Sequence, residues 1–209
     1  MKQFYSTVVM PRLLDRVMGG ESFSQRRRSL LAAAGGEVLE IGFGTGLNLP
    51  FYDRDRVASL AAIDPNGGMN RLARRRLAAA PFPVELRPLG GEALPYGDRT
   101  FDCVVSTWTL CSIREVGTAI DEIWRVLRPG GTFLFIEHGR SPDPAIARWQ
   151  DRLNPLQKRI GDGCHLNRNI AAIVQKRFPD AAIAAAYAPE FPKIGGYFYE
   201  GQALKPPTP

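Results

Sequence analysis

The sequence has 209 residues, of which 44% are hydrophobic and 23% are charged, and its formal net charge is +6. This length and composition predict one folded α/β domain over residues 1–209. They exclude a membrane-spanning chain, because no apolar segment is long enough to cross a bilayer. The N-terminus lacks a charged region followed by an apolar core, so a cytoplasmic protein is expected.

The hydrophobic pattern predicts helices and strands that alternate along most of the chain. Two amphipathic helices are expected at residues 4–18 and 23–33, separated by two glycines. The expected strands lie at residues 38–41, 60–63, 84–89, 101–106 and 132–136. The helices expected between them lie at residues 47–52, 69–80 and 116–127. This alternation predicts a parallel sheet that helices cover on both faces.

The pattern is less regular after residue 138. A helix is expected at residues 143–160 with an interruption at Pro155, and another at residues 169–178 with Asn167 as its cap. Residues 181–187 and 197–204 predict two final strands, and residues 205–209 predict a disordered tail. The chain thus divides into N-terminal helices at 1–34, a cofactor-binding core at 38–138 and a substrate-side part at 139–204.

Two runs of three arginines, residues 26–28 and 74–76, carry much of the positive charge. Both fall on expected amphipathic helices, which predicts that they form solvated faces. A peripheral contact with acidic lipid is the alternative. Nucleic acid is not expected as a partner, because no aromatic residues are interleaved with the arginines.

A glycine-rich stretch over residues 38–46 is the strongest functional signal. An apolar run ends in Glu40, and Gly42, Gly44 and Gly46 follow at alternate positions. Because glycine has no Cβ, the backbone can turn tightly there and a ligand can approach it. The pattern predicts a strand, a glycine loop and a helix N-terminus that together form a nucleotide-shaped site.

Two acidic residues indicate which nucleotide this site binds. Glu40 would repel a pyrophosphate, and Leu47 stands where the dinucleotide fingerprint has its third glycine. S-adenosylmethionine fits better, since it offers an ammonium group, a ribose and an adenine. Asp64 ends the next expected strand, 18 residues after Gly46, near the offset at which an acid accepts from ribose hydroxyls. The alternatives are a glycine turn without a ligand and a helix-capping role for Asp64.

These motifs together resemble the class I S-adenosylmethionine-dependent methyltransferases, and further blocks match in the same order. They are Gly91–Tyr96, Phe101–Ser106 and Arg125–Gly131. Within this class, the sequence resembles the type of methyltransferase that acts in ubiquinone and menaquinone biosynthesis. Three more blocks are similar to its thiol S-methyltransferase branch: Thr109–Ile113, Glu137–His138 and Asp162–Arg168. The resemblance implies a Rossmann-like, mostly parallel seven-stranded sheet with helices on both faces and an antiparallel last strand.

The resemblance also implies which residues bind the cofactor. Glu40 would hold the ammonium group, Asp64 the ribose hydroxyls, and the three loop glycines would let the backbone approach. The remaining implied contacts are Pro65 and Met69 on the adenine, Gly91 and Glu92 at its polar edge, and Thr107 at a strand end. Gly90 stands where many relatives have an aspartate for the adenine amino group, so Glu92 or the backbone is expected to make that contact.

Methyl transfer from a sulfonium depends mainly on alignment and on exclusion of water. A thiolate acceptor needs only deprotonation, whereas an amine or hydroxyl often needs a general base. His165 and His138 are the candidate catalytic residues, against the alternative that each has a structural role. The three cysteines, Cys103, Cys111 and Cys164, lack a metal-ligand spacing, so no metal is expected and they are expected to be reduced thiols.

The sequence therefore predicts a methyltransferase that acts on a small or amphipathic acceptor, in the first place an alkyl thiol or hydrogen sulfide. The alternatives within enzymes are a quinone precursor and a phosphatidylethanolamine head group. A non-catalytic cofactor-binding module is the alternative from another class. Five aromatic residues are expected either to wall an apolar acceptor pocket or to pack in the core, namely Trp108, Phe191, Tyr197, Phe198 and Tyr199.

Overall fold

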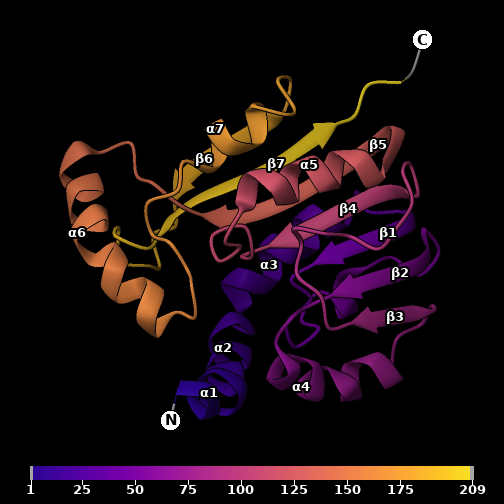
Figure 1. Cartoon of the computed structure of the whole chain (residues 1–209), viewed down its shortest axis with the longest axis horizontal. Helices are drawn as coiled ribbons and strands as arrows, with labels where there is room; N and C mark the ends of the chain where they lie inside the picture. Colours follow the sequence, from indigo (N-terminus) through magenta and orange to yellow (C-terminus); the bar gives the residue numbers. More distant parts are fainter. Residues whose placement is uncertain (1, 208–209) are drawn as a thin grey trace.

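The computed structural model describes residues 2–207, which fold around one seven-stranded sheet with the order β3-β2-β1-β4-β5-β7-β6 (Figure 1). The strands are β1 (Gly36–Ile41), β2 (Val57–Ile63), β3 (Val84–Arg87), β4 (Phe101–Thr107), β5 (Leu127–His138), β6 (Ala182–Tyr187) and β7 (Tyr197–Leu204). Strand β7 runs antiparallel to both of its neighbours, β5 and β6, and the other six strands share one direction. The predicted sheet with its antiparallel last strand is confirmed.

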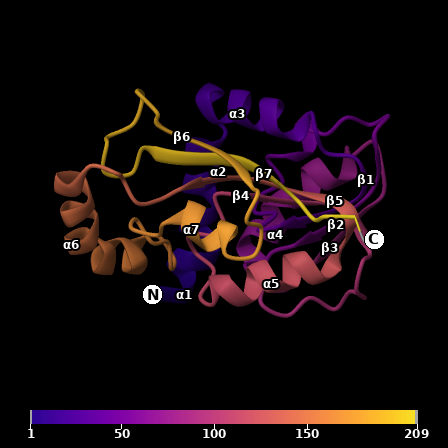
Figure 2. The same ribbon diagram turned by 90° about the horizontal axis from the view of Figure 1, so that it is seen from above.

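Helices lie on both faces of this sheet, as the alternating pattern predicts. The helical segments are α1 (Lys2–Phe4), η1 (Tyr5–Val9, a π-helical turn), α2 (Met10–Met18), α3 (Glu21–Leu31), η2 (Leu49–Phe51, 3-10), α4 (Gly67–Ala78), α5 (Val116–Val126), α6 (Pro144–Ile160) and α7 (Ile170–Gln175). Viewed from above, α3 covers one face, α5 and α7 cover the other, and α6 stands apart at one end (Figure 2). None of the described helices combines the length and hydropathy that a bilayer crossing requires.

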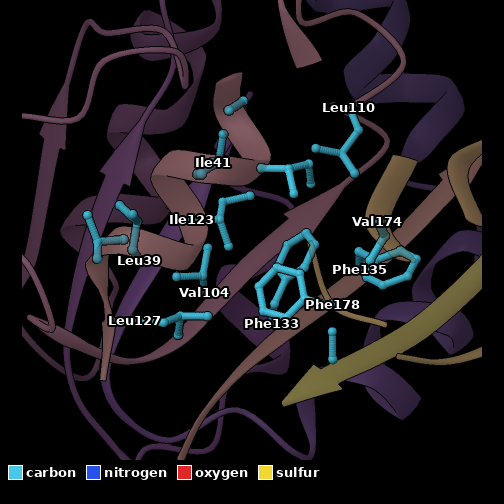
Figure 3. Packing of buried hydrophobic residues seen from close by; sticks show 14 of the residues in the cluster. Leu39, Ile41, Val104, Leu110, Ile123, Leu127, Phe133, Phe135, Val174 and Phe178 are labelled. Carbon is cyan, nitrogen blue, oxygen red and sulfur yellow. The ribbon is translucent and has the colours of Figure 1, made fainter. Parts of the chain in front are cut away.

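Alternate residues of each strand supply two separate cores, because successive side chains of a strand point to opposite faces. Leu39 and Ile41 of β1 belong to the cluster beneath α5 and α7, which Figure 3 shows around Ile123 and Phe133. Val38 belongs to the opposite cluster, beneath α3 and α4. Glu40 shares the face of Val38, so its side chain points toward α3 and η2.

The helix expected at residues 47–52 is wrong. The glycine loop leads instead into one turn of 3-10 helix, Leu49–Phe51, and Tyr52 is already extended, with ψ at 136°. The side chains of Asn48 and Tyr52 both donate to the buried carboxylate of Glu40. A single tight turn places both donors on that carboxylate, and the chain then leaves the site.

Two details of the C-terminal helices also differ from expectation. The helix α6 continues through Pro155 without a break. Proline removes the hydrogen bond to the carbonyl four residues earlier, which here belongs to the exposed residue Asp151. The cap of α7 is Asn169, whose side chain accepts from the backbone N–H of Ala172 at 3.1 Å, and not Asn167.

The arginine runs do not form uniformly solvated faces. Arg28, Arg74 and Arg75 are exposed, but Arg27 is only 3% exposed and lies over the ring of Trp108. Arg76 forms an ion pair with Asp15 of α2 at 2.7 Å. The expectation of a solvated face is therefore wrong for the residues of each run that turn toward the protein.

The expected disordered tail is wrong at its first residue. The backbone N–H of Lys205 donates to the carbonyl of Gly131, and its ammonium group donates to the carbonyls of Trp124 and Leu127. Residues 208 and 209 lie outside the described residues. The buried Cys103 of β4 packs in the core, as its apolar neighbours indicate.

Candidate functional site

A cavity of about 690 Å³ opens at the carboxyl ends of β1, β2, β4 and β5. Its size lies within the range of about 300–1,000 Å³ that is typical of small-molecule sites. Nine of the ten predicted cofactor residues line it: Glu40, Gly42, Gly44, Asp64, Pro65, Met69, Gly91, Glu92 and Thr107. The tenth, Gly46, does not line it; a Cβ there would lie 3.1 Å from the ring of Phe43, so this glycine permits packing beneath the loop.

The glycines of the loop have different roles. Gly42 and Gly44 both have positive φ angles, +76° and +58°, that side-chain-bearing residues rarely adopt. A Cβ on Gly42 would overlap the side chain of Thr109, whose own Cβ lies 2.6 Å away. A Cβ on Gly44 would meet only the carbonyl of Gly42, at 3.9 Å, and otherwise open space. Gly42 thus allows the Thr109 side chain to pack against the loop backbone, whereas Gly44 leaves room for a ligand in the cavity.

Glu40 is a fully buried carboxylate with protein donors on both oxygens. It accepts from the Tyr52 hydroxyl at 2.7 Å and from the Asn48 amide at 2.9 Å. Burial raises the pKa of Glu40 to about 8, although these donors and the nearby Arg27 guanidinium act in the opposite direction. The Nε of Arg27 donates to Oδ1, the side-chain amide oxygen of Asn48, at 2.9 Å, so the network continues to α3. An ammonium group in the cavity would favour the ionised carboxylate.

Sequence reasoning missed the partners of Glu40. Asn48 and Tyr52 are four residues apart directly after the glycine loop, and this spacing was the available signal. Asn48 also donates to the Thr107 hydroxyl at 3.0 Å, which ties the end of β4 to the same network. The role of Arg27 could not be recognised from the sequence, because this residue is one of three consecutive arginines.

Asp64 joins the end of β2 to the glycine loop. One carboxylate oxygen accepts from the N–H of Gly44 at 2.8 Å and the other accepts from the N–H of Asn66 at 2.7 Å. Burial raises the pKa of this carboxyl, and the two backbone hydrogen bonds lower it. The side chain of Asn66, not Asp64, caps α4 by accepting from Gly68, so the alternative in which Asp64 is the cap is wrong. Each carboxylate oxygen keeps a further lone pair for a ligand.

The N-terminal helices cover the mouth of the cavity. The Tyr5 hydroxyl donates to the carbonyl of Ile160 at 2.9 Å, and the Ser6 hydroxyl donates to Asp162 at 2.6 Å. On the other side, the Asn66 amide donates to the carbonyl of Ser6 at 2.9 Å. The segment thereby joins the end of α6 and the loop after it to the start of α4.

A second cavity of about 440 Å³ adjoins the first and is lined almost entirely by apolar side chains. The two cavities share Met18, Trp108, His138, Gln157 and Ile160. Of the five predicted aromatic residues, Trp108, Phe191 and Phe198 line the second cavity, whereas Tyr197 and Tyr199 do not. Among the described residues, no carboxylate lines it.

The two histidines lie in different surroundings. His138 ends β5 at the junction of the two cavities, and its Nε2 lies 3.0 Å from the Cys164 sulfur. His165 lines neither cavity; its Nδ1 lies 3.0 Å from the carbonyl oxygen of Cys111. Burial and the positive charge of Arg168 lower the pKa of His165. The hydrogen bond with Cys111 and burial raise the pKa of Cys164, so this thiol is protonated at neutral pH.

The loop after β4 is held in a rare conformation. Trp108 has a φ of +51°, which is uncommon for a large side chain. One oxygen of the buried Glu137 accepts from the N–H groups of Thr109 and Leu110, at 2.6 and 2.7 Å. Burial raises the pKa of Glu137 to about 7. These hydrogen bonds fix the loop that carries Trp108 and Cys111 into the site.

Six strands in one direction, a reversed strand inserted before the edge and a cavity at the carboxyl ends define an α/β protein built for a nucleotide-type cofactor. Residues 39–135 match the family described as "Methyltransferase domain". A phosphatidylethanolamine N-methyltransferase of Cereibacter sphaeroides is 36% identical over 152 residues, which cover 68% of this chain and 74% of that protein. The chain belongs to the class I S-adenosylmethionine-dependent methyltransferases.

Two other similar proteins represent the thiol branch and the solved structures. A thiol S-methyltransferase of Rattus norvegicus is 34% identical over 143 residues, or 66% of this chain. That match spans only 58% of the relative's length. A phosphoethanolamine N-methyltransferase of Haemonchus contortus, solved in complex with S-adenosyl-L-methionine, has a TM-score of 0.65 and 14% identity, over 94% of this chain and 60% of that one. At this identity the last comparison supports the fold alone.

Proposed function

We propose that this chain transfers the methyl group of S-adenosylmethionine to a small apolar thiol. One observation supports this most directly: His138 and Trp108 are among the residues shared by the cofactor-sized cavity and a smaller apolar cavity. An acceptor bound in the smaller cavity would therefore reach the cofactor in the larger cavity beside His138, whose imidazole can take up a proton. The similarity to a thiol S-methyltransferase supports the same acceptor class.

The larger cavity suits the cofactor at three points. The buried Glu40 carboxylate offers a charge to the ammonium group, and the space beside Gly44 admits the ligand to the backbone. Asp64 keeps lone pairs for the ribose hydroxyls. In the same proposal Pro65 and Met69 pack on the adenine, and Gly91, Glu92 and Thr107 complete the lining. The bound cofactor supplies an electrophilic methyl group on a sulfonium.

The smaller cavity favours a thiol over an amine. An ammonium acceptor would require an anionic partner, and among the described residues no carboxylate lines this cavity. A thiol is weakly polar and suits apolar walls, and it becomes a strong nucleophile once its proton is removed. At the junction of the two cavities, Nε2 of His138 is the proposed acceptor of the thiol proton. His165 acts as a positioning residue through its contact with Cys111.

A panel of thiols tests this function. With S-adenosylmethionine present, formation of S-adenosylhomocysteine is expected to increase with the apolar length of the thiol until the 440 Å³ cavity is filled. Replacing His138 with Asn is expected to lower turnover by about 10²–10⁴-fold, the usual contribution of a general base. His165→Asn is expected to cost less. Absence of thiol methylation at every pH would remove the proposal, and the reverse order of the two variants would remove the role of His138.

The pH dependence of cofactor binding tests the proposed role of Glu40. Because the pKa of Glu40 is about 8, its carboxyl group is largely protonated at neutral pH when no ligand is bound. An ammonium group binds the ionised form, so binding releases a proton, and affinity is expected to increase by up to about tenfold per pH unit between pH 6 and 7.5. Calorimetry with S-adenosylhomocysteine in buffers of different ionisation enthalpy measures this release. Glu40→Gln is expected to bind weakly and without pH dependence; a flat wild-type profile would contradict the role.

A phospholipid head group is the second candidate acceptor. The N-terminal helices and α6 carry exposed apolar side chains, namely Phe4, Leu13, Val17, Leu156 and Ile160. Of these, Leu13, Leu156 and Ile160 also line one or both cavities. Such exposed apolar side chains suit a membrane surface, and the similarity to a phosphatidylethanolamine N-methyltransferase agrees with it. Vesicles that contain phosphatidylethanolamine, offered in place of thiols, separate the two acceptors.

A cytoplasmic location is part of the main proposal, because all three cysteines are free thiols.

A further inference from the structure

Three side chains from distant parts of the sequence converge at the acceptor side of the cavity. They are Cys111 from the loop after β4, His138 from the end of β5 and Cys164 from the loop after α6. The two sulfurs and one histidine nitrogen all lie within 4.8 Å of one another, and all three residues line the larger cavity. The cluster thus combines two soft sulfur ligands, one imidazole and access to the ligand space.

The backbone around this cluster is fixed by groups outside it. Glu137 holds the loop before Cys111 through two backbone N–H groups. The carbonyl of Cys111 accepts from the N–H of His165 at 2.9 Å, which fastens the loop that carries Cys164. Arg168 donates to the carbonyl of Leu110 and strengthens the same connection. The two cysteines are therefore held together by contacts that a bound ion would not disturb.

The spacing of the three atoms suits a tetrahedral zinc ion. Zinc bonds of about 2.3 Å to sulfur and 2.0–2.1 Å to nitrogen place two sulfurs about 3.8 Å apart and a sulfur and a nitrogen about 3.6 Å apart. The separation of 3.0 Å between His138 Nε2 and Cys164 Sγ is shorter than the value for zinc ligands, and the three ligand atoms all lie within 4.8 Å of one another. Changes of about 1 Å or less at side-chain ends would complete the geometry.

We propose that Cys111, His138 and Cys164 form a zinc site whose fourth position is open to the cavity and holds the acceptor thiol. The role of the ion rests on the proposed thiol methylation, whereas the binding of zinc does not. The two cysteine protons would pass to solvent when zinc binds, and the acceptor thiol would release its proton to solvent when its sulfur takes the fourth position. That sulfur then forms a bond to the methyl carbon while the bond from carbon to the sulfonium sulfur breaks. The products are a thioether and S-adenosylhomocysteine.

Three protein ligands with an open position are characteristic of catalytic zinc, and structural sites use four. With two thiolates and a neutral imidazole the bound ion would have no net charge, which suits a half-buried site. The proton of His138 would reside on Nδ1, which is buried and has no hydrogen-bond partner among the described residues. In this form of the protein His138 is a ligand and not a base, and the ion would promote loss of the thiol proton by lowering the pKa of the acceptor thiol.

Titration of the reduced full chain with Co²⁺ tests the site without any enzymatic readout. Wild-type protein is expected to show thiolate-to-cobalt charge-transfer absorption at one ion per chain, and zinc is expected to displace it. Cys164→Ser and Cys111→Ser are expected to lower occupancy by more than tenfold. Cys103→Ala removes the remaining thiol, which lies in the core away from the cavity, and is expected to bind like the wild type. No charge-transfer band, or a band retained in Cys164→Ser, overturns the site.

Activity measurements then separate the site from its role. A chelator is expected to lower thiol turnover at least tenfold, zinc to restore it, and the affinity for S-adenosylhomocysteine to stay unchanged. Full turnover in chelator overturns the inference and leaves the proposed thiol methylation standing. Stoichiometric cobalt binding without thiol methylation leaves the metal site standing and overturns its proposed role. A further outcome is that Cys111 and Cys164 form a disulfide in the isolated protein. If the protein then binds no metal even after that bond is reduced, both the site and its role are overturned.

Discussion

Replacing Asp64 with Ala is expected to weaken the affinity for S-adenosylhomocysteine by about 10–150-fold. Hydrogen bonds to a charged acceptor contribute about 1.5–3 kcal/mol, and about 1.4 kcal/mol corresponds to a factor of ten. The carboxylate is buried and also accepts from the N–H groups of Gly44 and Asn66. Its loss therefore removes the proposed ribose acceptor and also the acceptor of these two backbone N–H groups, one in the glycine loop and one before α4. Isothermal calorimetry measures the change.

A matched control distinguishes the ribose role from a general loss of fold. Asp53→Ala removes an exposed carboxylate whose side chain accepts only from the N–H of Asp55, and it is expected to bind like the wild type. Asp64→Asn keeps one oxygen acceptor and is expected to be intermediate. Thermal unfolding of each variant without ligand shows whether the loop has collapsed. Wild-type affinity in a folded Asp64→Ala protein would contradict the ribose role.

Replacing Gly68 with Ala is expected to displace the N-terminal segment from the cavity. A Cβ at this position would overlap the backbone of Thr7 in η1, with its carbonyl carbon only 2.6 Å away. Because the obstacle is backbone, a change of side-chain rotamer cannot relieve it. Overpacking of this kind costs about 1–3 kcal/mol, which for a chain of this size lowers Tm by about 2–12 °C. We also expect faster proteolysis within residues 2–18 and weaker cofactor binding.

The neighbouring glycine provides the control. A Cβ on Gly67 would meet nothing within 4 Å, although it lies in the same first turn of α4. Alanine favours a helix by up to about 1 kcal/mol over glycine, so Gly67→Ala is expected to be neutral or slightly stabilising. Both variants add the same methyl group. Equal stability and equal proteolysis of the two would show that the η1 contact does not hold the segment in place.

Most of the fold was predictable because strands and helices bury their apolar residues at different periods. Residues 197–204 were predicted as a strand with the bounds that β7 has. The errors arose where side chains outside the local window decide the backbone. Residues 47–52 contain one 3-10 turn, Leu49–Phe51, and the two residues that flank it both donate to Glu40 of β1. Helix α6 continues through Pro155, and the residue whose carbonyl loses its helical donor, Asp151, lies on the exposed surface.

The cofactor side of the site was predictable for a different reason. Its residues follow strands directly, and the ends of parallel strands meet at one edge of a sheet. The acceptor side was predictable only in part, because it is assembled across long separations in the sequence. His138, Trp108, Phe191 and Phe198 were expected there and line the smaller cavity, but their partners were not foreseen. Arg27 reads as one charge in a run, and only the fold places it over Trp108. Likewise, Cys111 and Cys164 have no recognisable ligand spacing, and the fold alone brings them to His138.

The insertion of β7 between β5 and β6 has a consequence for synthesis on the ribosome. β5 ends at His138, but the strand that pairs with its open side does not begin until Tyr197. While the intervening residues are being translated, β5 presents unpaired backbone groups beside the very apolar run Phe133–Ile136. Exposed edges of this kind are where chains aggregate. Nascent chains that stall or terminate between these points are therefore the form of this protein most in need of a chaperone.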